Sequence, residues 1–63
     1  MDEPGSKVLI VDDTLANLQA IQGMLDDLKM PSSLAQSGHV ALEMCRERRS
    51  RRQPMFKLII LDL

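Results

Sequence analysis

Three aspartates follow two apolar segments of this chain, and carboxylates in such positions can bind a metal ion. Asp12 and Asp13 come directly after the apolar run that ends at Val11, and Asp62 comes directly after Leu58–Leu61. Carboxylates that lie close together repel one another, and a cation relieves that repulsion. Mg²⁺ prefers carboxylate and water oxygens in octahedral geometry. The sequence therefore predicts a Mg²⁺ site formed by Asp12, Asp13 and Asp62, provided that the fold brings the two segments together.

The elements that must position these aspartates form an alternating series. Residues 7–11 and 58–61 are apolar runs without polar alternation, which is typical of parallel strands covered on both faces. Residues 32–36 form a shorter, more polar segment that suits an edge strand. Leucine and isoleucine recur at helical spacing from Leu15 to Leu28. A second helix is expected to begin after Ser37, with an unclear end in the arginine-rich segment.

The order strand, helix, strand, helix, strand predicts an α/β fold with parallel strands and right-handed crossovers. Ligands of open α/β sheets bind at the carboxyl ends of the strands, near a switch in strand order. If the strand order is 2-1-3, the first and third strands are neighbours. Asp12, Asp13 and Asp62 then lie together at one edge of the sheet.

Composition limits the classes of function. The chain has 63 residues, with 9 acidic against 8 basic residues, a balance that argues against a general nucleic-acid binder. The longest apolar runs are too short to cross a membrane. One cysteine, Cys45, excludes an internal disulfide and fits a reducing, cytoplasmic location. We expect residues 1–6 to be a disordered leader without a signal peptide and residues 7–63 to form one partial domain.

Several segments together resemble the receiver domain of two-component response regulators. Residues 8–13 (VLIVDD) are similar to the opening strand and acidic pair of that family, and Asn17 is frequent there. Ser37-Gly38 followed by Ala41-Leu42-Glu43 resembles its second strand-to-helix junction. Residues 58–63 (LIILDL) resemble its third strand with the phosphoacceptor. The resemblance implies a βαβαβ three-stranded parallel sheet of order 2-1-3, the first half of a flavodoxin-like receiver fold.

The resemblance also implies a function in a two-component phosphorelay. Asp62 would accept a phosphoryl group from a phosphohistidine, which would make the chain a cytoplasmic signal-transduction phosphoprotein and not an enzyme. Asp12 and Asp13 would hold the Mg²⁺ that neutralises charge on the transferring oxygens. The implied partner is a histidine kinase or a phosphotransfer protein. No nucleic-acid or membrane partner is expected.

The chain departs from the receiver pattern after its third strand. It stops one residue after Asp62, so the family's metal-binding carbonyl two residues past the acceptor has no counterpart. Its switch Ser/Thr and its lysine have none either, and impaired phosphorylation is expected. Two alternatives stay open: a truncated, non-phosphorylatable binding fragment, and the start of a haloacid-dehalogenase-type phosphatase. A further expected partner is the remainder of the same domain, or a second copy, along the edge of the third strand.

Each of these residues also has a purely structural interpretation. Asp13 or Thr14 would cap the first helix, and Asp62 would be a polar residue that ends a strand. Asn17 and His39 would be exposed helix residues, without a ligand role for the histidine. Met44 and Cys45 would face the core. The five arginines of residues 46–52 would form a solvated loop, or a docking patch for an acidic partner or a phosphate.

Overall fold

The chain forms an α/β sandwich whose elements follow the expected order. A computed structural model describes residues 5–61, so Asp62 and most of the expected leader lie outside the described residues. The five elements are β1 (Val8–Val11), α1 (Leu15–Asp27), β2 (Ser32–Ala35), α2 (Gly38–Ser50) and β3 (Leu58–Leu61). The strands form one parallel sheet in the order β2-β1-β3, with Val8 opposite both Ser32 and Leu58. The predicted fold class and strand order are confirmed.

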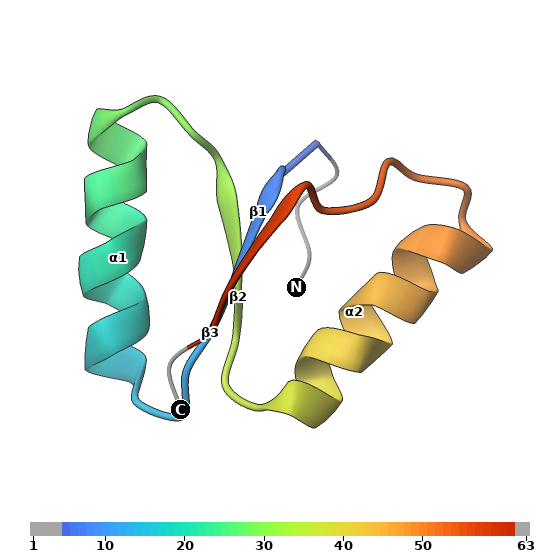
Figure 1. Cartoon of the computed structure of the whole chain (residues 1–63), viewed down its shortest axis with the longest axis horizontal. Helices are drawn as coiled ribbons and strands as arrows, with labels where there is room; N and C mark the ends of the chain where they lie inside the picture. Colours follow the sequence, from blue (N-terminus) through green and yellow to red (C-terminus); the bar gives the residue numbers. More distant parts are fainter. Residues whose placement is uncertain (1–4, 62–63) are drawn as a thin grey trace.

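The central strand β1 is buried on both faces because the two helices lie on opposite sides of the sheet (Figure 1). Side chains alternate between the faces of a strand. Val8 and Ile10 pack with Leu18 and Leu25 of α1, and we call these four residues the α1-side cluster. The intervening residues pack on the side of α2, in a cluster that we call the α2-side cluster and that consists of Leu9, Val11, Ala35 and Met44. An unbroken apolar run in β1 is therefore what a two-sided core requires.

Strand β3 is exposed, as its edge position in the order 2-1-3 predicts and its apolar run alone does not. Its apolar run indicated a strand covered on both faces, yet Leu58 is 50%, Ile59 47% and Leu61 60% exposed. Among the described elements the backbone of β3 lies close to β1 alone, so most of its side chains are left uncovered. Ile60 is the exception in this strand, since it packs against the α1-side cluster. An apolar run predicts burial only where another element supplies the covering layer.

The connection from α2 to β3 is held by a buried arginine. The sequence favoured a solvated loop from Arg46 to Arg52, whereas α2 continues to Ser50 and Arg48 is 0% exposed. Its Nη1 donates to the carbonyl oxygens of Ser6 (2.6 Å) and Pro54 (3.0 Å). Its guanidinium lies 3.6 Å from the centre of the Phe56 ring, a cation–π contact. Arg48 thus ties together the two segments that lead into β1 and β3.

The amino-terminal segment takes part in this arrangement. Ser6, which the sequence placed in the leader, is only 2% exposed. The next carbonyl, that of Lys7, accepts hydrogen bonds from the backbone N–H groups of Lys57 (2.8 Å) and Leu58 (3.2 Å). These bonds begin the pairing of β3 with β1. The register that places Leu61 beside Val11 at the far end of the sheet starts from this contact.

Candidate functional site

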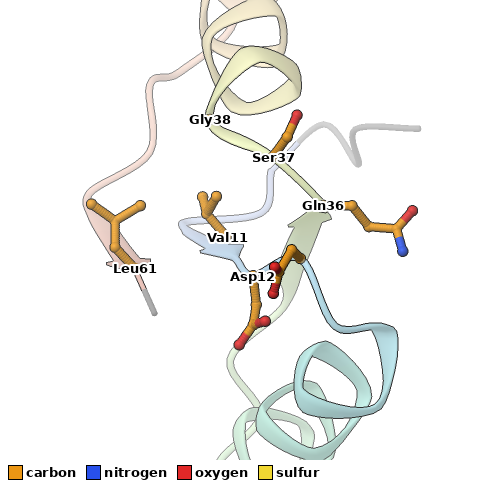
Figure 2. Close-up of a pocket in the computed structure, with 7 residues that line it drawn as sticks. Val11, Asp12, Gln36, Ser37, Gly38 and Leu61 are labelled. Atoms are coloured by element: carbon orange, nitrogen blue, oxygen red, sulfur yellow. The ribbon is translucent and has the colours of Figure 1, made fainter. Parts of the chain in front are cut away.

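A pocket of about 300 Å³ opens at the carboxyl end of the sheet. It lies where β1 leads into α1, β2 leads into α2 and β3 ends (Figure 2). Its lining residues are Val11, Asp12, Asp13, Gln36, Ser37, Gly38 and Leu61. This is the edge at which α/β sheets bind ligands, because connections diverge there to opposite faces. The strand order β2-β1-β3 places β1 at the divergence.

Asp12 lies at the floor of this pocket and is 3% exposed. Its Oδ1 accepts a hydrogen bond from the backbone N–H of Thr14 (2.8 Å), and its Oδ2 accepts one from Nδ2 of Asn17 (3.2 Å). These two hydrogen bonds hold the Asp12 carboxylate against the turn that leads from β1 into α1. A carboxylate has about four lone-pair positions, so two hydrogen bonds do not exclude a role as a metal ligand.

Asp13 lies at the rim and is exposed. Its Oδ1 accepts a hydrogen bond of 3.3 Å from Oγ1 of Thr14. Thr14 is the N-cap residue of α1, but its own side chain accepts no capping hydrogen bond. The sequence placed the cap at Asp13 or Thr14. Thr14 does occupy the N-cap position, but no side-chain hydrogen bond caps the start of α1, so the capping role predicted for Asp13 or Thr14 is not found.

The start of α2 forms the opposite wall of the pocket. Ser37 is the N-cap residue, and its Oγ accepts the backbone N–H of Val40 at 3.1 Å, as the sequence predicted. Figure 2 shows Ser37 and Gly38 at the turn that leads from β2 into this helix. Unsatisfied N–H groups and the helix dipole give the N-terminus of a helix a partial positive charge, which favours anions. A carboxylate pair and an anion-binding helix end therefore face one pocket.

The structure brings together two of the three aspartates predicted for the metal site. Asp12 and Asp13 share the pocket, and Leu61 also lines it. Asp62 lies outside the described residues. Within residues 5–61, no group of three His, Cys, Asp or Glu side chains is arranged to hold a metal ion. Cation binding at Asp12 and Asp13 therefore requires ligands from water, from residues beyond that range or from a bound molecule.

Two other residues acquire clear roles. Asn17, interpreted from sequence as a solvated residue, remains exposed but donates to Asp12. Its position five residues after Asp12, on the first turns of a helix, was the only signal for this contact. His39 is exposed as expected, with its side chain 79% exposed and its Nε2 3.1 Å from Glu43. Met44 is buried, and Cys45 packs against the α2-side cluster.

Comparison with known proteins points away from the receiver family. No family model matches the chain, and no solved structure matches it. A xanthine phosphoribosyltransferase of Oenococcus oeni is 45% identical over 40 residues. The matched segment makes up 64% of this chain and 19% of that relative.

This similarity corrects the function that the sequence motifs implied. The resemblance to receiver domains and the two-component phosphorelay function that it implied are wrong, because the similar protein is a phosphoribosyltransferase. The same similarity contradicts the expectation that the chain is not an enzyme. The physical reason is that short apolar strands followed by aspartate occur in α/β proteins of many functions, because ligands bind at the carboxyl edge of such sheets. These motifs therefore indicate the fold and the place of a site but do not identify the family. The expected kinase or phosphotransfer partner followed from the resemblance alone and stays an untested prediction.

The helices of the described residues also bear on the membrane. Neither α1 nor α2 has the length and the apolar character that a helix needs to cross a bilayer.

Proposed function

We propose that the pocket at the carboxyl end of the sheet binds a divalent cation together with a phosphate-bearing small molecule. The observation that carries this proposal is the presence of Asp12, Asp13 and the N-terminus of α2 in one pocket. Carboxylates alone would repel a phosphate, and the helix end alone would hold it weakly. A Mg²⁺ ion between carboxylate and phosphate oxygens removes the repulsion and supplies the geometry that such sites use.

Each residue has a defined role in this proposal. Asp13, exposed at the rim, binds the cation directly or through water. Asp12, held by Thr14 and Asn17, contributes a fixed negative charge from the floor of the pocket. The backbone N–H groups of Gly38 and His39, at the start of α2, donate hydrogen bonds to the phosphate oxygens. Asp62, which follows Leu61 in the sequence, is proposed as a further cation ligand.

A phosphoribosyl compound is the ligand class favoured by the similarity to a phosphoribosyltransferase. The chain spans 19% of that relative's length, so it would supply the cation- and phosphate-binding part of such an enzyme's site. The proposal extends to a cytoplasmic location, which is supported by the free and partly buried thiol of Cys45. Microscopy of a fluorescent fusion would test that location.

A titration followed by NMR tests the binding proposal. We expect Mn²⁺ to broaden the amide signals of residues 11–14 and 37–38 first. With Mg²⁺ present, ribose 5-phosphate should shift the signals of Gly38 and His39, whereas ribose should not. Inorganic phosphate distinguishes recognition of the phosphate from recognition of the whole sugar phosphate.

Variants assign the effect to the pocket. Asp13→Asn and Asp12→Asn should each weaken Mn²⁺ binding by about tenfold or more. Asp27→Asn is the matched control, because it removes one carboxylate at the other end of α1. Broadening centred elsewhere, or sugar phosphate binding that is independent of the cation, would refute the proposal.

A further inference from the structure

The five arginines of residues 46–52 lie in three different environments. Arg48 is buried and holds the carbonyls of Ser6 and Pro54. Arg51 pairs with Glu47, one turn earlier in the helix, at 3.1 Å. Arg46, Arg49 and Arg52 are exposed, and we call these three the arginine face. Arg48 and Arg51 therefore make contacts within the fold, whereas the arginine face is exposed to solvent.

The arginine face has no acidic partner among residues 5–61. The carboxylate of Glu47 is engaged by Arg51, and that of Glu43 lies 3.1 Å from His39. No ion pair joins Arg46, Arg49 or Arg52 to a carboxylate of the described residues. Three exposed cations therefore lie between residues 46 and 52 of a chain whose formal net charge is −1.

Helix stability explains only part of this arrangement. Basic residues in the last turn interact favourably with the helix dipole, and Arg49 occupies that turn. Arg46 precedes the last turn, so it gains less from the dipole. Arg52 follows the helix with a φ of 55°, in the left-handed region where glycine is the usual residue. An arginine there is costly for the backbone, so helix stability does not account for its presence.

We propose that the arginine face is a docking surface for an acidic segment of a partner protein. Arg46 and Arg49 lie three residues apart, which is about 4.5 Å along the helix axis. Carboxylates three or four residues apart on a partner helix have a similar spacing. Arginine forms paired hydrogen bonds with a carboxylate. Two adjacent arginine–carboxylate pairs, one at Arg46 and one at Arg49, would define the orientation of the bound segment.

Rigidity at this end of α2 supports docking. Arg48 lies between Arg46 and Arg49 in sequence and binds two chain segments and the Phe56 ring. The backbone that carries the arginine face is therefore fixed before a partner arrives, which lowers the entropic cost of binding. The partner is not expected to be single-stranded nucleic acid, because the one aromatic ring of the chain is already stacked on Arg48.

Fluorescence anisotropy with a labelled peptide tests this surface. The probe is a 14-residue helical peptide with glutamate pairs at i, i+3 spacing, and its glutamine version is the uncharged control. The double variant Arg46→Gln/Arg49→Gln should weaken binding of the acidic peptide by about tenfold, the product of two exposed ion pairs. Raising the salt concentration should weaken binding by the unmodified chain and have little effect on the variant.

A second double variant separates a specific surface from net charge. Lys7→Gln/Lys29→Gln also removes two positive charges, at the pocket formed with Gly5 and Pro31. It should change peptide binding less than about twofold. Equal losses in both variants, no binding at low salt, or displacement of the peptide by duplex DNA at equal charge concentration would each overturn the proposal. Circular dichroism confirms that both variants are folded, and pocket titrations with Mn²⁺ are unaffected if the two sites are independent.

Discussion

At the scale of single residues, Asp12 combines two functions that compete for the same oxygens. Its carboxylate accepts hydrogen bonds from Thr14 and Asn17, and it also forms the floor of the pocket. The acidic pair was predictable because aspartates at strand ends are conspicuous in the sequence. The contact with Asn17 was not, since an exposed amide on a helix has many possible partners and only the geometry selects one.

The hydrogen bond from Asn17 provides a test of how Asp12 is positioned. Replacing Asn17 with alanine removes the hydrogen bond to Oδ2 of Asp12 and leaves the one from the Thr14 N–H to Oδ1. We expect Mn²⁺ binding to weaken by about threefold to tenfold, less than for Asp12→Asn, because residues that orient a ligand contribute less than the ligand itself. Relaxation enhancement measures the affinity. Gln19→Ala, an exposed change on the same helix, is the control, and an equal effect of both substitutions would show that Asn17 has no positioning role.

Arg48 is the residue whose role the sequence concealed. It lies within a run of arginines, and residue type alone does not distinguish the buried one from the exposed ones. Arg48→Met should lower the free energy of unfolding by about 3 kcal/mol, because the buried carbonyl of Ser6 and the carbonyl of Pro54 lose a charged donor and the Phe56 ring loses its cation. Arg49→Met makes the same chemical change at an exposed position and should cost less than about 0.5 kcal/mol. Urea unfolding followed by circular dichroism decides between them, and similar midpoints for the two variants would contradict the structural role of Arg48.

At the scale of elements, the sequence predicted each strand and helix in the right order. The beginnings of the helices were predictable because Ser37 and the aspartates before Leu15 are typical helix-capping residues. The end of α2 was not, since residues 46–50 form helix without an apolar stripe. The exposure of β3 was predictable from its edge position in the order 2-1-3 and not from its apolar run, because such a run specifies a strand and leaves its neighbours undetermined.

The orientation of β3 can be tested with two substitutions of the same type. Ile60 packs against the α1-side cluster, whereas Ile59 faces the other side and is 47% exposed. Ile60→Ala should therefore destabilise the chain by about 1–2 kcal/mol, and Ile59→Ala by about 0.5 kcal/mol or less. Chemical denaturation measures both. A reversed order would indicate that β3 is shifted by one residue, since such a shift exchanges the faces of every side chain.

At the scale of the whole molecule, the two helices cover β1 and β2 but leave the edge strand β3 largely uncovered. Strand β2 is also an edge strand, but Ser32, Ser33 and Ala35 are buried beside the helices. The backbone of β3 lies close to neither helix, and no further strand of residues 5–61 pairs with its outer edge. Unpaired N–H and C=O groups beside exposed apolar side chains are a template for pairing with another strand.

A second copy of the chain is the partner we expect at this edge. It carries the same unpaired backbone groups and the same exposed side chains of Leu58, Ile59 and Leu61. Antiparallel pairing of two β3 strands about a twofold axis would satisfy both edges at once and bury these side chains against their counterparts. Twofold dimers are the commonest symmetric assembly. We therefore expect sedimentation equilibrium to show a dimer or larger species at tens of micromolar.

Substitution of Ile59 by lysine is the decisive test of that assembly. A charge at the centre of the exposed strand opposes edge-to-edge pairing, because it would face its copy across the new contact without a partner. We expect Ile59→Lys to be monomeric, with the far-UV spectrum of the folded chain retained since Ile59 is already half exposed. Met24→Lys introduces the same charge at a 66% exposed position on α1 and should leave the dimer intact. If the unmodified chain sediments as a folded monomer throughout, or if both lysine variants dissociate equally, β3 is not the surface through which the molecule associates.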